Sequence, residues 1–177
     1  LDCSYLGEIS HERKYKTVFA LLRRKKTSIL ITNPVTSFRF VESIRKLRRR
    51  VEQHMDGGKV LIVTSLLENE GKSTVTVNLA LAMEQKGKRV LLIDCDLRKP
   101  ACGMVLGQSK FTYGLNDILG GKENLSECFL RYQNSDMYML LAKRGEQNTG
   151  DLLISPRMNA LLDWARECFD FIVLDLP

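Results

Sequence analysis

Hydrophobic residues follow two alternating patterns along this 177-residue chain, short unbroken runs and longer helical repeats. The unbroken runs predict four buried strands, over residues 59–65, 89–94, 137–141 and 170–174. Between them, apolar residues that recur every three or four positions predict helices from Lys72 to about Lys86 and from Ser155-Pro156 onward. Continuously apolar strands that alternate with amphipathic helices are typical of a parallel sheet with helices on both faces, so we predict an α/β fold.

A further helix is expected ahead of the first strand, from Thr36 or Ser37 to about Met55. The Asp-Gly-Gly sequence at 56–58 ends it. Its apolar residues recur at helical spacing on one face: Phe40, Val41, Ile44, Leu47 and Val51. The other face is charged and carries Glu42, Arg45, Arg49 and Glu52, with Arg48 on its flank.

Several shorter segments have weaker patterns. Short helices are expected near residues 115–119 and 124–130, and a short strand over Ser28–Thr32. The basic stretch from His11 to Lys26 is compatible with partial helix.

Basic residues are concentrated at the front of the chain. Residues 1–59 hold fourteen Lys and Arg against six Asp and Glu, whereas residues 60–177 hold thirteen against fifteen. Such a segment favours an anionic surface, membrane or nucleic acid, although a solvated helical face is the simpler explanation of the charge alone. We therefore expect a basic lead-in over 1–35 and a single domain over 36–177.

The strongest candidate chemistry lies between the first strand and the next helix, where residues 64–74 read T-S-L-L-E-N-E-G-K-S-T. In that context backbone N–H groups and a helix N-terminus bind phosphate, Lys72 neutralises the outer phosphates and the Ser73 hydroxyl ligates Mg²⁺. Leu66 replaces the first glycine of G-x-x-x-x-G-K-[ST], so a glycine-initiated helix with an incidental lysine is the simpler alternative. The predicted nucleotide-binding residues are Glu70, Gly71, Lys72, Ser73 and Thr74.

Carboxylates follow two of the predicted strands. Asp94 and Asp96 end the strand at 89–94, and Asp175 ends the last one. Open α/β sheets bind ligands at the carboxyl ends of their strands, where one carboxylate can support a metal ion while another accepts a proton. The simpler alternative is that these carboxylates only cap loops.

Taken in order, these motifs resemble those of the bacterial P-loop tyrosine kinases that govern capsule and exopolysaccharide synthesis. The family's loop T-S-x-x-P-G-E-G-K-S-T is similar to residues 64–74, and its D-x-D-x-R-x-P motif to residues 94–100. Its D-T-P-P motif is similar to residues 175–177. Its E-x-x-R-x-x-R helix is similar to residues 42–48, for which intrahelical Glu–Arg pairs are the simpler explanation.

The resemblance implies transfer of the γ-phosphoryl group of ATP to tyrosine hydroxyls, chiefly in the tail of a neighbouring copy, with Mg²⁺ as the metal. Catalysis would then rest mostly on positioning and on charge stabilisation. The implied roles are phosphate binding by Lys72, metal binding by Ser73 and Asp94, general base or metal support by Asp96, and outer-shell metal support by Asp175. Asp94 and Asp96 could exchange roles.

The resemblance also implies partners and a location. Glu42, Arg45 and Arg48 would contact a neighbouring subunit in a ring of identical copies. The lead-in resembles the cytoplasmic segment that follows a transmembrane helix in fused members, so we expect the cytoplasmic face of the bacterial inner membrane. Expected partners are a polysaccharide co-polymerase domain, fused or separate, and a cognate tyrosine phosphatase, with no nucleic acid.

The chain also departs from the family pattern. Glu68 and Asn69 replace Pro-Gly, Leu176 replaces threonine, and no tyrosine-rich tail follows Pro177, so we expect a longer natural protein. Two alternatives stay open. The first is an ATPase of the class that partitions DNA or places division sites; members of that class carry a lysine where Leu67 stands, which counts against it. The second is a nucleotide-binding assembly module without turnover.

Overall fold

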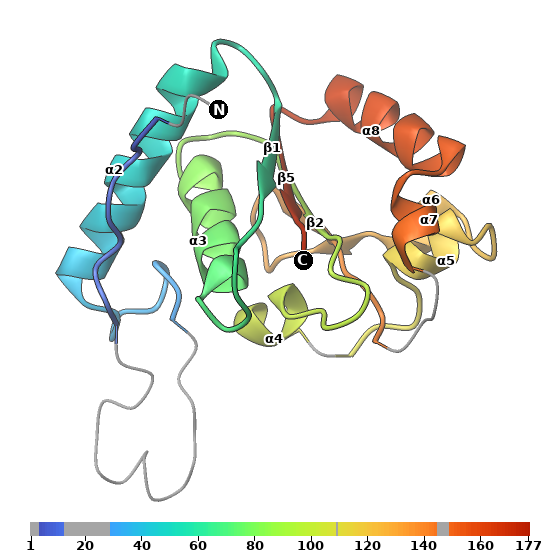
Figure 1. Cartoon of the computed structure of the whole chain (residues 1–177), viewed down its shortest axis with the longest axis horizontal. Coiled ribbons are helices and arrows are strands. Elements are labelled where there is room, and N and C mark those ends of the chain that lie inside the picture. Colours follow the sequence, from blue (N-terminus) through green and yellow to red (C-terminus); the bar gives the residue numbers. More distant parts are fainter. Residues whose placement is uncertain (1–3, 13–28, 109, 145–148) are drawn as a thin grey trace, which may run out of the picture.

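A five-stranded sheet forms the centre of the computed structural model, which describes residues 4–12, 29–108, 110–144 and 149–177 (Figure 1). Four parallel strands lie side by side in the order β1 (Val60–Val63), β5 (Phe171–Asp175), β2 (Val90–Asp94) and β4 (Met137–Leu140). The fifth, β3 (Leu130–Arg131), pairs antiparallel with β4 at the edge. The predicted α/β class is confirmed, and β3 adds an antiparallel edge strand that the sequence pattern did not predict.

The strand register determines where the functional side chains meet. Val90 of β2 pairs with Phe171 of β5, and the same register continues to the pair Asp94 and Asp175. Parallel strands end at the same edge of a sheet, so both carboxylates lie at the carboxyl edge, on neighbouring strands.

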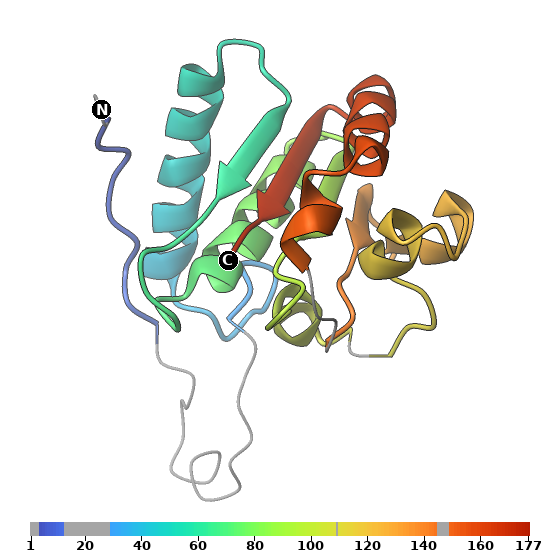
Figure 2. The ribbon, with the colours of Figure 1, turned by 45° about the vertical axis from the view of Figure 1, so that its right-hand side comes forward.

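Helices cover both faces of the sheet (Figures 1 and 2). One face carries α2 (Phe38–Met55), α3 (Lys72–Glu84) and α4 (Cys102–Leu106). The other carries α5 (Leu115–Leu119), α6 (Leu125–Cys128), α7 (Thr149–Leu153) and α8 (Pro156–Cys168). A hydrophobic core lies on each face of the sheet, and successive residues of β2 contribute to opposite cores because side chains alternate across a strand. Val90 and Leu92 pack on the α3 side, and Leu91 and Ile93 pack on the α8 side.

Helix α2 begins and ends as its sequence predicts. The Ser37 hydroxyl accepts a hydrogen bond from the Phe40 N–H, and Asp56 and Gly57 end the helix with left-handed backbone at φ 43° and 82°. The predicted apolar face is buried through Phe40, Ile44 and Val51. Residues 4–12 run along this helix, where the Ser10 N–H donates to the Ser43 hydroxyl (Figure 1).

Helix α3 is more completely buried than one apolar face requires. Every residue from Thr76 to Met83 is buried, since the helix lies between α2 and the sheet. It is therefore a central helix of the domain, and its N-terminus is held firmly at the carboxyl edge of the sheet.

Two expected elements differ in the structure. The strand predicted over Ser28–Thr32 is wrong for its described residues 29–32, because the Ile31 N–H donates to the Asn78 side chain and the Leu30 carbonyl accepts from a following turn. The helix expected over 124–130 stops at Cys128, because Leu130 pairs with β4.

The partial helix expected from His11 to Lys26 falls almost wholly outside the described residues. None of the helices in the described part of the chain is long and apolar enough to cross a membrane.

Candidate functional site

The loop between β1 and α3 approaches the carboxyl edge of the sheet with two left-handed residues. Gly71, the N-cap of α3, has φ 91°, and Asn69 has φ 65°. Asparagine tolerates this region better than other residues with a side chain, so Asn69 fits the loop where the family pattern has glycine. No side chain caps the N-terminus of α3, which leaves its first N–H groups available to an anion.

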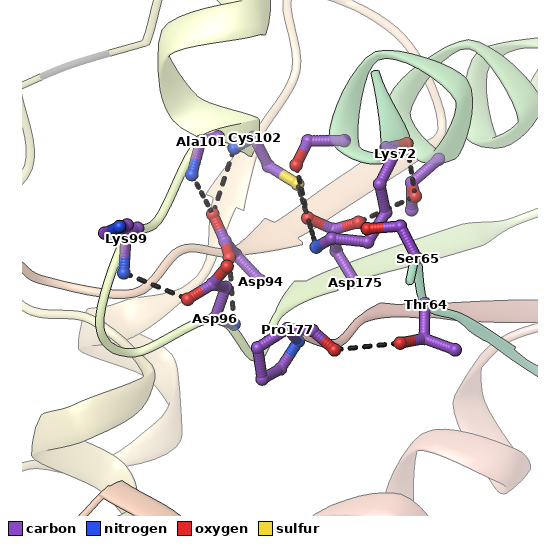
Figure 3. Close-up of polar contacts among 12 residues, drawn as sticks. Thr64, Ser65, Lys72, Asp94, Asp96, Lys99, Ala101, Cys102, Asp175 and Pro177 are labelled. Carbon is purple, nitrogen blue, oxygen red and sulfur yellow. Dashed lines mark hydrogen bonds and ion pairs between the residues drawn. The ribbon is translucent and has the colours of Figure 1, made fainter. Parts of the chain in front are cut away.

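Asp175 is the centre of the polar network at this edge (Figure 3). Its Oδ2 lies 2.9 Å from Lys72 Nζ and accepts a hydrogen bond of 2.7 Å from the Ser73 hydroxyl. Its Oδ1 accepts one of 2.8 Å from the Thr76 hydroxyl. The carboxylate is fully buried, and three side chains of the first turns of α3 converge on it.

Lys72 is held but incompletely partnered. Its side chain is only 10% exposed, and its Nζ has no hydrogen-bond acceptor at suitable angles among the described residues. The short distance to Asp175 makes that contact an ion pair rather than an aligned hydrogen bond. Buried polar groups in proteins are nearly always satisfied, so this ammonium is suited to an anionic ligand that supplies further acceptors.

Asp94 lies beside Asp175 and is held by backbone groups of the following loop. Its Oδ2 accepts from the N–H groups of Ala101 and Cys102 at 3.1 and 3.0 Å, and its Oδ1 from Asp96 N–H at 3.2 Å. Burial, and secondly the charge of Asp175, raise the pKa of Asp94 to about 7, against the opposing effect of these N–H donors. Near neutral pH this carboxyl is poised between its two protonation states.

Cys102 connects the two carboxylates. Its N–H donates to Asp94, and its Sγ lies 3.5 Å from Asp175 Oδ2. Burial raises the pKa of the Cys102 thiol well above its usual value, so the thiol is a proton donor here. One potential ligand atom from each of Asp94, Cys102 and Asp175 lies within 4.8 Å of the others. The carboxylate oxygens and the Ser73 hydroxyl suit Mg²⁺, whereas a protonated thiol does not.

The remaining predicted residues lie around this cluster. Asp96 is partly exposed, and its Oδ1 accepts from Lys99 N–H at 2.9 Å. Glu70 is exposed and accepts from Leu67 N–H at 3.1 Å, while the Thr74 carbonyl accepts from the Asn78 amide. The structure thus brings Lys72, Ser73, Asp94 and Asp175 together, with Asp96 adjacent and Glu70 turned to solvent.

The charge that Glu68 adds to the loop is compensated. Its carboxylate is 72% exposed and pairs with Lys99 at 2.7 Å. A lysine from the loop after β2 therefore offsets the negative charge that Glu68 brings to this loop.

Two contributors were missed from the sequence. Thr76 stands four positions after Lys72, on the same side of α3, so helical spacing could have identified it. Cys102 begins α4, a helix of five residues that follows an irregular loop and is too short to give a periodic signal in the sequence.

The E-x-x-R-x-x-R residues lie on α2, outside this network. Arg45 and Glu42 form an exposed ion pair of 2.8 Å. Arg48 was expected on the flank of the charged face, yet it is buried and pairs with Glu52 one turn further along.

A surface hollow lies at the opposite, amino-terminal edge of the sheet. Its lining includes Lys59 and Asp170, which precede β1 and β5. None of the site carboxylates lines it, so the hollow is separate from the carboxylate cluster.

Comparison with known proteins agrees with this geometry. A family model described as AAA domain matches residues 59–177. The tyrosine-protein kinase Wzc of Salmonella typhi is 33% identical over 164 residues, which cover 92% of this chain and 22% of Wzc. The solved structure of the kinase domain of the Escherichia coli tyrosine kinase Etk superimposes with a TM-score of 0.76 at 28% identity, over 88% of this chain and 62% of that domain.

A more distant structural neighbour is an ATPase. The septum site-determining protein MinD of Pyrococcus horikoshii, complexed with Mg-ADP, has a TM-score of 0.59 at 26% identity, over 67% of this chain and 49% of MinD. The chain spans about a fifth of the length of the curated tyrosine kinases that it matches.

Proposed function

Because the chain belongs to the AAA domain family, we propose that it binds ATP at the carboxyl edge of its sheet and transfers the γ-phosphoryl group to tyrosine hydroxyls. The observation that carries nucleotide binding is Lys72, a buried lysine at an uncapped helix N-terminus whose Nζ lacks a hydrogen-bond acceptor. Transfer to tyrosine is supported by the names of the relatives, which are tyrosine-protein kinases.

The residues present fit a magnesium ion. Ser73, Asp94 and Asp175 would hold it, and when bound it would neutralise charge on the phosphates. The fit rests on two neighbouring, fully buried carboxylates, of which only Asp175 has a basic partner, the ammonium of Lys72, among the described residues.

The chain's own groups account for the remaining steps. Lys72 would exchange Asp175 for phosphate oxygens, because the ion pair leaves its N–H groups without aligned acceptors. Asp94 has a pKa suited to proton transfer near neutral pH, but its side chain is fully buried. Asp96 is partly exposed and therefore better placed to accept the proton of an incoming tyrosine hydroxyl.

The test is Lys72→Met, with Lys86→Met in the turn that follows α3 as the matched control. Binding of a fluorescent ATP analogue and phosphorylation of a tyrosine-rich peptide added in trans are both measured, with circular dichroism to confirm folding. We expect Lys72→Met to abolish both activities and Lys86→Met to leave them unchanged. Undiminished peptide phosphorylation by Lys72→Met would refute the proposal.

The likeness to MinD favours one alternative, an ATPase that does not act on tyrosine. Leu67 argues against it, since a lysine is expected there in that class. ATP hydrolysis without phosphotyrosine would identify this alternative, and nucleotide binding without turnover would identify an assembly module.

Assembly and location extend the proposal. The exposed Arg45 and the partly exposed Glu42 are available to a neighbouring copy in a ring, whereas the buried Arg48 would first have to break its ion pair with Glu52. We place the protein at the cytoplasmic face of the bacterial inner membrane, with a polysaccharide co-polymerase domain and a tyrosine phosphatase as partners. The basic lead-in, mostly outside the described residues, would contact anionic lipid.

A further inference from the structure

An exposed ion pair joins the phosphate-binding loop to the loop that follows β2. Lys99 Nζ lies 2.7 and 2.8 Å from the two carboxylate oxygens of Glu68, 31 positions away in the sequence. Both side chains are largely exposed, at 63% for Lys99 and 72% for Glu68. No part of the function proposed above uses this contact.

The pair is continuous with the buried carboxylates. The Lys99 N–H donates to Asp96, and the Asp96 N–H donates to Asp94 (Figure 3). One chain of polar contacts therefore runs from Glu68, in the loop that leads to Lys72, to the aspartates of the neighbouring loop. Any group bound between the two loops would lie next to this connection.

Charge gives the pair a role beyond surface packing. Lys72 is the one basic residue of the sequence from 64 to 74, whereas a nucleoside triphosphate brings several negative charges. Lys99 is a second lysine, already held against that loop by Glu68. Exposed ion pairs contribute little stability, so Lys99 can change partners at small cost.

We propose that Lys99 is a second phosphate-binding cation, held by Glu68 in the nucleotide-free protein and passed to the terminal phosphate of a bound nucleoside triphosphate. Glu68 then acts as a competing anion that restrains nucleotide binding. This inference rests on the proposed nucleotide site but not on tyrosine as the acceptor.

The test compares binding of fluorescent triphosphate and diphosphate analogues to Lys99→Met, Glu68→Gln and the double variant. A charge-assisted contact to the terminal phosphate predicts about tenfold weaker triphosphate binding by Lys99→Met and less than about twofold change for the diphosphate. Glu68→Gln should bind the triphosphate about threefold more tightly, because Lys99 loses its competing partner. The double variant should stay well below Glu68→Gln. Lys86→Met, in the turn after α3, and Glu167→Gln, on α8, are the matched controls, because both side chains are exposed and lie outside the two loops.

Two results would overturn the inference while leaving the nucleotide site intact. One is unchanged triphosphate binding by Lys99→Met, or an equal loss for both nucleotides, when Lys72→Met abolishes binding. The other is a double variant that binds like Glu68→Gln, because Lys99 would then only neutralise Glu68. If Lys72→Met itself binds normally, the proposed nucleotide site fails independently of Lys99.

Discussion

Replacing Asp94 by asparagine should stabilise this protein at alkaline pH, although Asp94 belongs to the proposed active site. The carboxyl group is fully buried beside Asp175, and its pKa is raised from 3.8 to about 7. Between these two values the folded state holds a proton that the unfolded state has lost. The free energy of unfolding therefore decreases as the pH rises from about 4 to about 7, and this contribution is constant at higher pH.

The size of the effect follows from the pKa shift and the hydrogen bonds. A shift of about 3 units at about 1.4 kcal/mol per unit gives a penalty of about 4 kcal/mol for the ionised group. Asparagine keeps one oxygen for the N–H groups of Ala101 and Cys102, but its amide NH₂ cannot accept from Asp96 N–H. That loss costs about 1–2 kcal/mol, so we expect Asp94→Asn to gain about 2–3 kcal/mol at pH 8.

Urea unfolding at pH 5, 6.5 and 8 measures this difference. The advantage of Asp94→Asn should shrink steadily toward pH 5, where the wild-type carboxyl is protonated in the folded state. Asp163→Asn is the matched control, because Asp163 lies on α8 with its side chain 75% exposed and should change stability by less than about 0.5 kcal/mol. An Asp94→Asn variant that is less stable than wild type at pH 8, or a difference that does not vary with pH, would refute the reasoning.

Three further predictions concern the lead-in and α2. Asn78→Ala should lower the free energy of unfolding by about 3 kcal/mol, because the buried side-chain amide makes hydrogen bonds to the backbone of Ile29, Ile31 and Thr74. The control Asn159→Ala, at an exposed position, should change the stability little, and equal urea midpoints for the two variants would contradict this prediction. Arg45→Ala should reduce the oligomer size measured by light scattering. The chain should stay folded, since the ion pair of Arg45 with Glu42 contributes only about 0.5 kcal/mol to stability, and an unchanged oligomer size would exclude an intersubunit contact of Arg45. A peptide of residues 1–35 should bind anionic vesicles less tightly as the salt concentration is raised, because salt screens its positive charges. Neutral vesicles are the control, and binding that does not depend on salt would refute an electrostatic contact of the lead-in with lipid.

Local patterns in the sequence were sufficient to predict most elements and the candidate residues. The continuously apolar runs became β1, β2, β4 and β5. Burial on both faces leaves β2 and β5 no polar positions, whereas the prediction of a buried strand is wrong for β1, an edge strand whose Ile62 is 62% exposed. Ser37 and Asp56 delimited α2 because capping depends on neighbouring residues alone. The sequence from Gly71 to Thr74 predicted a phosphate-binding loop for the same reason, since a strand, a glycine and a helix N-terminus are contiguous in the chain.

The tertiary structure alone decided which of these residues meet. The insertion of β5 between β1 and β2 places Asp175 beside Asp94 and within reach of Lys72, about a hundred positions earlier in the chain. Strand order depends on contacts between segments far apart in sequence, which no periodicity records. The same holds for Cys102 between the two carboxylates and for Lys99 on Glu68. The irregular loop after β2 carries Lys99 and leads to Cys102 at the start of α4, and its path is set by packing against other elements. The raised pKa of Asp94 likewise arises from burial and from Asp175, a neighbour that only the folded chain supplies.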